Sequence, residues 1–230
     1  MRKLNKRTKA NRQKVEKRLY DKEDAIRLLK EITNTNFVES VEAHISLSID
    51  AKYSDQQLRS TLILPKGTGK KKRIAVLMPA ESITTEYQEL ADIVGSNDLI
   101  DTITKGNLNF DILIATPNMM PKLAKLGRLL GPKGLMPSPK AGTVTTDVKI
   151  TLEEFKKGKL EFKADKTGIV HLSVGKGNFS DSDLLENLVA VYTSIENNRP
   201  PGVKGRYFKT FHICSSMGPS IEIDISTLRL

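Results

Sequence analysis

The chain has 230 residues, and its 37 Lys and Arg against 27 Asp and Glu give a formal net charge of +10. This basic excess favours an anionic partner, a nucleic acid or else a membrane surface, although no apolar run approaches the ~18 residues of a membrane-spanning helix. The single cysteine, Cys214, excludes an intramolecular disulfide framework and an all-cysteine metal site. With no Trp, five Tyr and seven Phe, a single-strand binder that depends mainly on stacking is also disfavoured.

The N-terminal part of the sequence predicts a basic arm followed by a helix. Residues 1–20 carry nine Lys and Arg by position 18, with Glu16 the only acid among them. We expect a frayed or partner-ordered arm that contacts phosphates, the alternative being a solubilising tail. The helix is expected to begin after Asp21 as its N-cap, with Asp24 three residues on and an apolar stripe over 25–32.

Two kinds of predicted strand then follow one another. Residues 41–49 alternate strictly between apolar and polar, which is typical of a strand with one buried and one wet face, and 60–64 resembles it. After Pro65–Lys70 the pattern changes to continuous apolar runs over 74–78 and 110–115. Such runs indicate strands covered on both faces, and the helical stripes between them predict a small wound α/β layer structure.

Alternation returns after residue 159. Residues 160–164 and 170–174 are expected to form a hairpin around the turn at 165–168. His212 and Cys214 lie on one face of a later strand, where a core thiol is a better interpretation than a Cys/His nucleophile pair, because no orienting third group accompanies them. A long helix and two final strands are expected over 185–195, 207–214 and 221–225.

The predicted strands near both chain ends alternate between apolar and polar residues, whereas those in the middle are continuously apolar. This difference predicts an α+β protein of two domains. One discontinuous domain would combine 21–65 with 159–230, the inserted α/β domain would span 66–158, and the basic arm would precede them. The two connections would then lie side by side and act as a hinge. The hinge glycines are expected to be Gly67, Gly69 and Gly158.

Catalytic and cofactor signatures are missing from the sequence. The loops at 67–71 and 175–177 both fail the glycine fingerprints of phosphate and dinucleotide binding. His44, His171 and His212 are scattered, and none has zinc-ligand spacing to a Cys or a second His. We therefore predict no catalytic residue, no metal site and no cofactor, and a protein that is not an enzyme.

Three segments are richer in Gly, Pro, Lys and hydroxyl groups than turns require. They are the cationic loop over 125–144, the turn over 165–171 and the turn over 215–219. Backbone amides and hydroxyls beside a glycine can approach a sugar-phosphate backbone closely, and long ordered loops are often functional. Taken singly, each segment is equally compatible with an ordinary turn or a rigid connection.

Together these segments are recognisable. With Asn36–Glu42, Ser54–Arg59, Leu64–Lys70 and Ala115–Pro117, they make the chain, from about residue 20 to 225, resemble the L-one family of large-subunit ribosomal proteins, found in the mobile stalk beside the tRNA exit site. The resemblance implies a split βαββαβ sandwich built from both chain ends that binds rRNA, and an inserted Rossmann-like domain without a nucleotide. It also implies assistance in the release of deacylated tRNA and repression of translation of the chain's own mRNA.

The resemblance further implies the partners and the site. The partners would be large-subunit rRNA, exit-site tRNA, the chain's own mRNA and other ribosomal components, with no membrane, and the chain would be a monomer off the ribosome. The RNA-contacting positions of the family fall on one expected surface. They are Phe37, Ser40, Asp165, Lys166, Thr167, His171, Ser216, Met217 and Gly218.

The chain departs modestly from the family pattern. Ser216 replaces the usual Thr and keeps the hydroxyl, whereas Lys133 replaces the common Arg and lacks its bidentate fork. The composition is biased toward Lys, Asn and Ile, and no transit peptide is recognisable. Both features are expected of a plastid-encoded chain in the chloroplast stroma, and a bacterial cytoplasm is the alternative location. Two rival functions remain: a free-standing RNA-binding repressor, and an enzyme that uses the Rossmann-like domain.

Overall fold

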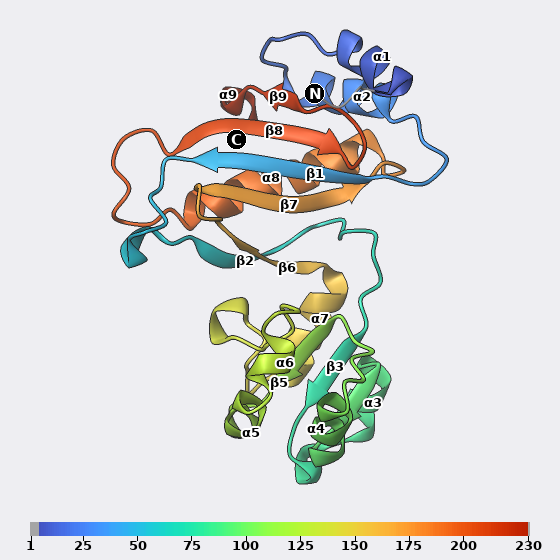
Figure 1. Cartoon of the computed structure of the whole chain (residues 1–230), viewed down its shortest axis with the longest axis vertical. Helices are drawn as coiled ribbons and strands as arrows, with labels where there is room; N and C mark the ends of the chain where they lie inside the picture. Colours follow the sequence, from blue (N-terminus) through green and yellow to red (C-terminus); the bar gives the residue numbers. More distant parts are fainter. Residues whose placement is uncertain (1–4, 230) are drawn as a thin grey trace. The chain divides into compact units, whose positions relative to one another are not determined.

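The computed structural model describes residues 5–229 and divides into two compact units (Figure 1). One unit joins the chain up to Gly69 with the chain from Leu160 onward, and the other runs from Lys70 to Lys159. Helices combined with several sheets confirm the predicted α+β class. No helix in the described part of the chain combines the length and apolar character needed to cross a membrane.

The first unit is built from both ends of the chain. Its helices are α1 (Lys6–Lys14), α2 (Lys22–Ile32), η1 (Ser54–Gln56), α8 (Asp181–Asn197) and α9 (Ile225–Leu228). Its strands are β1 (Ser40–Leu47), β2 (Arg59–Ile63), β6 (Lys159–Lys163), β7 (Ile169–Lys176), β8 (Phe208–Ser215) and β9 (Ile221–Ile223).

A four-stranded sheet of order β7-β1-β8-β9 organises this unit. Strand β1 pairs antiparallel with β7 on one side and with β8 on the other. Its burial alternates along its whole length, with Val41, Ala43, Ile45 and Leu47 in the core, as the alternation in the sequence predicts. Helices α2 and α8 pack against the core face, behind the sheet in Figure 1, so the other face carries the polar side chains.

The predicted hairpin over 160–174 is wrong. The turn forms where expected, but β6 and β7 share only the bridge between Ala164 and Val170. Strand β6 pairs with β2 in a separate two-stranded sheet, whereas β7 continues as a neighbour of β1. Sequence proximity favours a hairpin, but β7 buries more apolar surface by joining the large sheet beside β1.

Three local predictions also change. Helix α2 follows Asp21, yet the Asp21 side chain accepts no capping hydrogen bond. The last strand ends at Ile223, because Asp224 caps α9 through its side chain, which accepts a hydrogen bond from the Ser226 N–H. The basic arm contains helix α1, which is anchored where the Asn11 Nδ2 donates to the Ile32 carbonyl at 2.8 Å. The first four residues of the predicted arm lie outside the described residues.

The second unit has a parallel three-stranded sheet of order β4-β3-β5. Its strands are β3 (Ile74–Leu77), β4 (Ile93–Gly95) and β5 (Ile112–Ala115). Its α-helices are α3 (Thr85–Leu90), α4 (Asn97–Thr104), α5 (Met120–Ala124), α6 (Gly127–Leu130) and α7 (Val148–Lys157). Its 3-10 turns are η2 (Ala80–Ser82), η3 (Pro117–Met119) and η4 (Pro139–Ala141).

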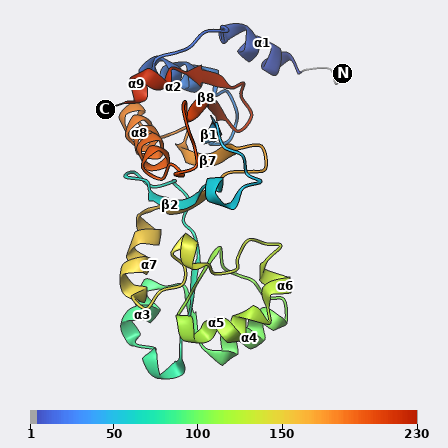
Figure 2. The ribbon, with the colours of Figure 1, turned by 90° about the vertical axis from the view of Figure 1, so that its left-hand side faces the viewer.

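Both faces of this sheet are covered, which explains the unbroken apolar runs. Ala75 and Leu77 face a core shared with α4, α5 and α6, whereas Ile74 and Val76 face a core shared with α3 and α7. Figure 2 shows these two groups of helices on opposite sides of the second unit. Strand β4 was not predicted, because its three residues are too few to show a period.

A buried amide ties the segment after β2 to the first unit. Asn187 on α8 has no exposed surface; its Oδ1 accepts from the Lys66 N–H at 3.0 Å, and its Nδ2 donates to the carbonyls of Gly67 at 3.1 Å and Val174 at 2.8 Å. The side chain therefore satisfies three backbone groups that water cannot reach from within the core.

We expect Asn187→Ala to lower the free energy of unfolding by about 3 kcal/mol, because it leaves these backbone groups unpaired. Urea unfolding measures this loss. Asn197→Ala is the matched control, an exposed amide on the same helix that should change stability by less than about 0.5 kcal/mol. Equal losses for the two variants would contradict the assigned role.

Candidate nucleic-acid interface

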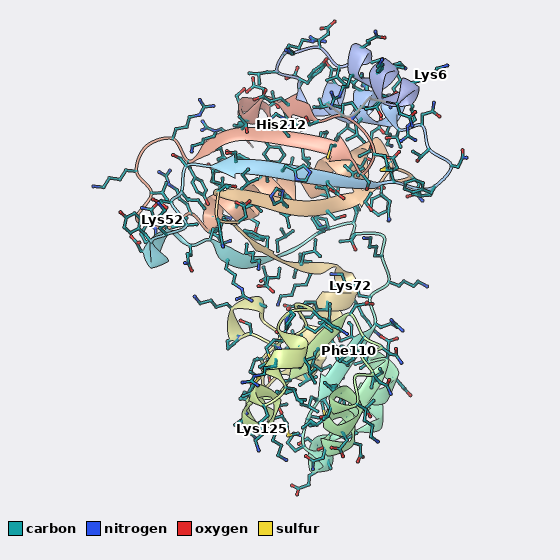
Figure 3. The ribbon with its side chains drawn as sticks, viewed as in Figure 1. Lys6, Lys52, Lys72, Phe110, Lys125 and His212 are labelled. Atoms are coloured by element: carbon teal, nitrogen blue, oxygen red, sulfur yellow. The ribbon has the colours of Figure 1, made fainter. Side chains whose placement is uncertain are left out.

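The polar face of the four-stranded sheet, here called the open face, is the centre of the candidate interface. It consists of the half-exposed positions of three strands, and Figure 3 shows His212 on the near side of β8. Its members are Ser40, Glu42, His44 and Ser46 on β1, His171 and Ser173 on β7, and Thr210, His212 and Cys214 on β8. The face therefore offers hydroxyl, imidazole and carboxylate groups in place of an apolar docking surface.

One end of the open face is made by the turn between β8 and β9. The Ser216 N–H donates to the Ser40 carbonyl at 3.0 Å, so the turn continues the pairing of β8 with β1. The Lys176 Nζ donates to the Ser40 Oγ at 3.0 Å from the end of β7. Met217 and Phe37 are both 55% exposed. Five of the predicted site residues thus come from this end of the unit: Phe37, Ser40, Ser216, Met217 and Gly218.

Glu39 holds this turn in place and was missed as a site residue. It is 2% exposed, and its Oε2 accepts a hydrogen bond from the Met217 N–H at 2.9 Å. Burial acts to raise the pKa of Glu39, but the Ser215 hydroxyl, the Met217 N–H and the Thr35 hydroxyl together hold that pKa below its usual value. The sequence did contain a sign that Glu39 is buried. Position 39 lies two residues before Val41, so it falls on the buried side of the alternating strand.

Gly218 completes the turn for a steric reason. Its N–H donates to the Ser215 carbonyl at 3.0 Å, and a Cβ built at this position would lie 2.4 Å from the Ser215 Oγ. The turn can therefore close against the strand only where the residue lacks a side chain, so Gly218 shapes the site without offering a contact group of its own.

The turn at 165–168 is organised by its first side chain. The Asp165 Oδ1 accepts hydrogen bonds from the N–H groups of Thr167 and Ile169, both at 2.8 Å, and from the Thr167 hydroxyl at 2.7 Å. These donors, with Ile169 first and Thr167 second, lower the pKa of Asp165 to about 2. Asp165 is therefore a fixed anion that shapes the turn, while Lys166 and Thr167 are exposed beside it.

The two turns lie at opposite ends of the sheet. Ser216 pairs with Ser40 at the start of β1, whereas the Leu47 N–H at the other end of β1 donates to the Gly168 carbonyl at 2.9 Å. With a rise of about 3.3 Å per residue, about 20 Å of strand separates them. The predicted single surface is therefore an elongated one, bounded by one turn at each end.

A row of three histidines spans the middle of the open face. In the register of the sheet, His44 on β1 lies opposite His171 on β7 and His212 on β8. The Nδ1 atoms of His44 and His171 are 2.8 Å apart, and the His171 Nε2 lies 3.7 Å from the Asp165 Oδ2. His171 thereby connects the turn at Asp165 to the centre of the face.

Cys214 is not a core thiol, contrary to the prediction. The core positions of β8 are Phe208, Phe211, Ile213 and Ser215, so Cys214 faces the half-exposed side with its Sγ 3.2 Å from the His44 Nε2. Burial, and then the Glu42 carboxylate, raises the pKa of the Cys214 thiol. Burial, and then His171, lowers the pKa of His44. Both shifts favour the neutral forms.

Cationic side chains border the open face at its β9 side. A groove there is lined by Arg12, Lys17, Arg18 and His212, together with Glu16 and Glu222. The first three come from the N-terminal arm and the segment after α1. This groove places part of the basic excess of the chain next to the strand face, where it can meet phosphate charge.

The predicted hinge glycines all adopt left-handed backbone conformations, with φ of 65° at Gly67, 68° at Gly69 and 109° at Gly158. A Cβ at Gly69 would also lie 2.9 Å from the Lys176 Cγ. Gly67 is tied to Asn187 and Gly158 ends helix α7, so two of the three are fixed by their own unit.

The cationic loop over 125–144 is ordered within the second unit. It contains α6 and returns to the sheet, where the Ala115 N–H donates to the Thr143 carbonyl at 2.9 Å. The charged side chains of Lys125, Arg128, Lys133 and Lys140 are exposed along it. The loop therefore presents cations from a fixed backbone.

The turn at Asp165 should make stability depend on pH in the acid range. Because the folded-state pKa of about 2 lies below the usual value of 3.8, the stabilisation is complete above about pH 4 and is lost as the pH falls toward 2. Urea unfolding at pH 7, 4 and 2.5 should show that Asp165→Asn is less stable than wild type at pH 7, by a margin that shrinks with acid. Thr167→Val, which removes one donor, should show a smaller form of the same effect. A margin that does not change with pH would contradict the assignment.

The resemblance expected from the sequence is confirmed by comparison with known proteins. Residues 29–219 match the profile of the ribosomal protein L1p/L10e family. The chain is 61% identical over 229 residues to the large ribosomal subunit protein uL1c of Guillardia theta, covering 100% of this chain and 98% of that protein. It is 56% identical over 229 residues, with the same coverage, to the large ribosomal subunit protein uL1 of Prochlorococcus marinus. The chain therefore belongs to the ribosomal protein L1p/L10e family.

Proposed function

We propose that the chain is a structural protein of the large ribosomal subunit that binds large-subunit rRNA through the open face and its two end turns. Relatives from a plastid-bearing alga and a cyanobacterium carry the name of a large-subunit protein. Membership of a family of ribosomal proteins also confirms that the chain is not an enzyme. The rival function of a Rossmann-like enzyme is therefore set aside.

The observation that carries the proposal is the construction of the Ser216 turn. Buried Glu39 and the Ser40 carbonyl hold its backbone N–H groups, so the turn is already ordered before any ligand arrives. The Met217 side chain is exposed, and the exposed Ser216 hydroxyl, which donates weakly to the Ser40 carbonyl at 3.3 Å, keeps its oxygen free to accept from a ligand. A preorganised turn loses little entropy on binding, and hydroxyls suit the 2′-hydroxyl and phosphate groups by which folded RNA is recognised.

The remaining predicted contacts divide by chemistry. Lys166 and the cations of the N-terminal groove supply phosphate contacts, and Phe37 supplies an exposed ring that can stack on a base. Asp165 and Gly218 contribute by shaping their turns. His171 lies between the two turns, so the RNA is expected to follow the length of β1.

The resemblance to the family supports finer proposals. We propose that the second unit borders the path of deacylated tRNA in the exit site, with the cationic loop over 125–144 as its contact surface. We also propose that the two connections between the units act as a hinge, with Gly67 and Gly158 fixing the ends of the connections on their own units. We also propose that the open face binds the chain's own mRNA to repress translation. The proposed location is the chloroplast ribosome, with the ribosome of a bacterial cytoplasm as the alternative.

The second candidate function is a free-standing translational repressor that works off the ribosome. Co-sedimentation with large ribosomal subunits at moderate salt separates the two. Recovery of the chain in the subunit fraction supports the ribosomal role. A chain found only in the unbound fraction, while still binding its mRNA, favours the repressor.

Ser216→Val should weaken the binding of large-subunit rRNA by about 1–3 kcal/mol, since it removes a hydroxyl and leaves its RNA partner unpaired. Gel-shift titration measures the affinity. Thr104→Val, an exposed hydroxyl on α4, is the control and should leave rRNA affinity unchanged. Unchanged affinity in the Ser216 variant, with the fold intact by circular dichroism, would remove Ser216 from the site.

The salt dependence of binding should reveal how many phosphates the protein contacts. If about six phosphates are neutralised, the logarithm of the affinity should fall with the logarithm of the salt concentration at a slope of roughly −4 to −5. Lys166→Gln should make that slope shallower by about 1, because it removes one phosphate contact. A flat salt response in the wild type would contradict an interface based on phosphate contacts.

A further inference from the structure

The centre of the open face contains a group of side chains whose chemistry is that of metal ligands and differs from the hydroxyl and ammonium groups at its ends. Glu42, His44 and Cys214 each offer a ligand atom, and these atoms all lie within 4.8 Å of one another. We propose that they form a binding site for one zinc-type divalent cation, with the Cys214 Sγ, the His44 Nε2 and a Glu42 carboxylate oxygen as its three protein ligands. The site belongs to the free protein and does not depend on the proposed RNA binding.

The two distances from the His44 Nε2 to the other ligand atoms are close to those around a tetrahedral ion. Bonds of about 2.3 Å to sulfur and about 2.0–2.1 Å to nitrogen require the sulfur and nitrogen to be about 3.5 Å apart, and similar bonds to nitrogen and oxygen require about 3.4 Å. The Cys214 Sγ and the His44 Nε2 are 3.2 Å apart, and the Glu42 Oε2 lies 3.7 Å from the same nitrogen. Shifts of about 0.3 Å would bring these two distances to the tetrahedral values, and the sulfur and carboxylate oxygen, which lie within 4.8 Å of one another, would have to come to about 3.6 Å by side-chain rotation.

The imidazole of His44 is oriented as a metal ligand needs, with Nε2 toward Cys214 and Nδ1 toward His171. Its other ring nitrogen, Nδ1, is 2.8 Å from the His171 Nδ1, and the His171 Nε2 faces the Asp165 carboxylate. If His171 keeps its proton on Nε2 toward Asp165, then His44 donates from Nδ1 and leaves the lone pair on Nε2 directed at Cys214. A ligating histidine normally has its second ring nitrogen held by such a hydrogen bond.

The two carboxylate oxygens of Glu42 have different neighbours. The Oε2 is the oxygen near His44, whereas the Oε1 lies 3.5 Å from the Ser216 Oγ, which is itself 3.3 Å from the Ser40 carbonyl. The three ligand residues are half-buried, so an ion is reachable from solvent while partly shielded by the sheet. Their donor set of one thiolate, one imidazole and one carboxylate suits zinc better than calcium or magnesium, which prefer oxygen alone.

Binding is an exchange of a proton for a metal ion. In the metal-free protein the pKa of Cys214 is raised, so the group that the ion meets is the thiol, 3.2 Å from the His44 Nε2. The arriving dication takes the thiolate electron pair as a new S–metal bond, the proton leaves to solvent, and no electron is transferred. The fourth coordination position is filled by water on the exposed side.

Cobalt(II) is a suitable probe, because the chain has a single cysteine to report on. Titration of the full chain, produced without a histidine tag, should show one equivalent bound, a near-ultraviolet band from the thiolate and visible bands typical of four-coordination. Zinc should displace the cobalt. Absence of the near-ultraviolet band at saturating cobalt would overturn the proposal.

Variants then test each ligand. Cys214→Ser should abolish the near-ultraviolet band, and His44→Gln should weaken zinc binding at least tenfold, with a smaller loss for Glu42→Gln. Lys209→Gln is the control, since it changes an exposed side chain on the same strand as Cys214 that is not a member of the open face, and zinc affinity should stay within twofold of wild type. A loss in Lys209→Gln equal to that in His44→Gln would overturn the assigned ligand set.

Alkylation of the thiol provides a second measurement that does not depend on cobalt. One equivalent of zinc should slow the reaction of Cys214 with iodoacetamide at least tenfold in the wild type and much less in His44→Gln. Equal protection in both proteins would show that the thiol binds zinc alone and would overturn the three-ligand site. Thermal melting of every variant verifies that the sheet remains folded.

Discussion

The pairing of β1 with strands on both sides is the interaction on which the rest of this protein depends. A strand from the N-terminal part of the chain lies between two strands from the C-terminal part, β7 and β8. The register of β1 places His44 between His171 and His212 at the centre of the sheet. At the two ends of the strand, Ser40 lies beside Ser216 and Leu47 lies beside Gly168. Because side chains alternate with a period of two, a slip of one residue would bury the histidines and expose the core.

Buried polar side chains convert this sheet into a surface with defined ends. Glu39 holds the Met217 N–H at one end of β1, and Asn187 holds the backbone of Lys66 and Gly67 below the sheet. Each is enclosed by protein and forms hydrogen bonds with main-chain groups. Glu39 thereby fixes the turn that presents Ser216 and Met217, and Asn187 fixes the segment that follows β2.

The open face combines two kinds of chemistry in one row of residues. Its ends carry hydroxyl and ammonium groups, the partners of a polyanion, whereas its centre carries sulfur and imidazole, which are ligands for soft or borderline cations. Glu42 connects the two regions, since one of its oxygens faces Ser216 and the other faces His44. The two regions therefore adjoin at this one side chain.

The sequence by itself determined which faces are buried and what class of fold results. The alternation over 41–49 predicted the two-sided strand β1, the runs at 74–78 and 110–115 predicted a sheet covered on both faces, and the motifs at 126–144 and 216–219 identified the family. Only the tertiary structure decided which strands are neighbours: β6 pairs with β2 and not with β7, and Cys214 meets Glu42 and His44 from another strand. The physical reason is that periodicity reports on which side of a strand a residue lies, whereas the choice of partner depends on contacts between segments more than a hundred residues apart.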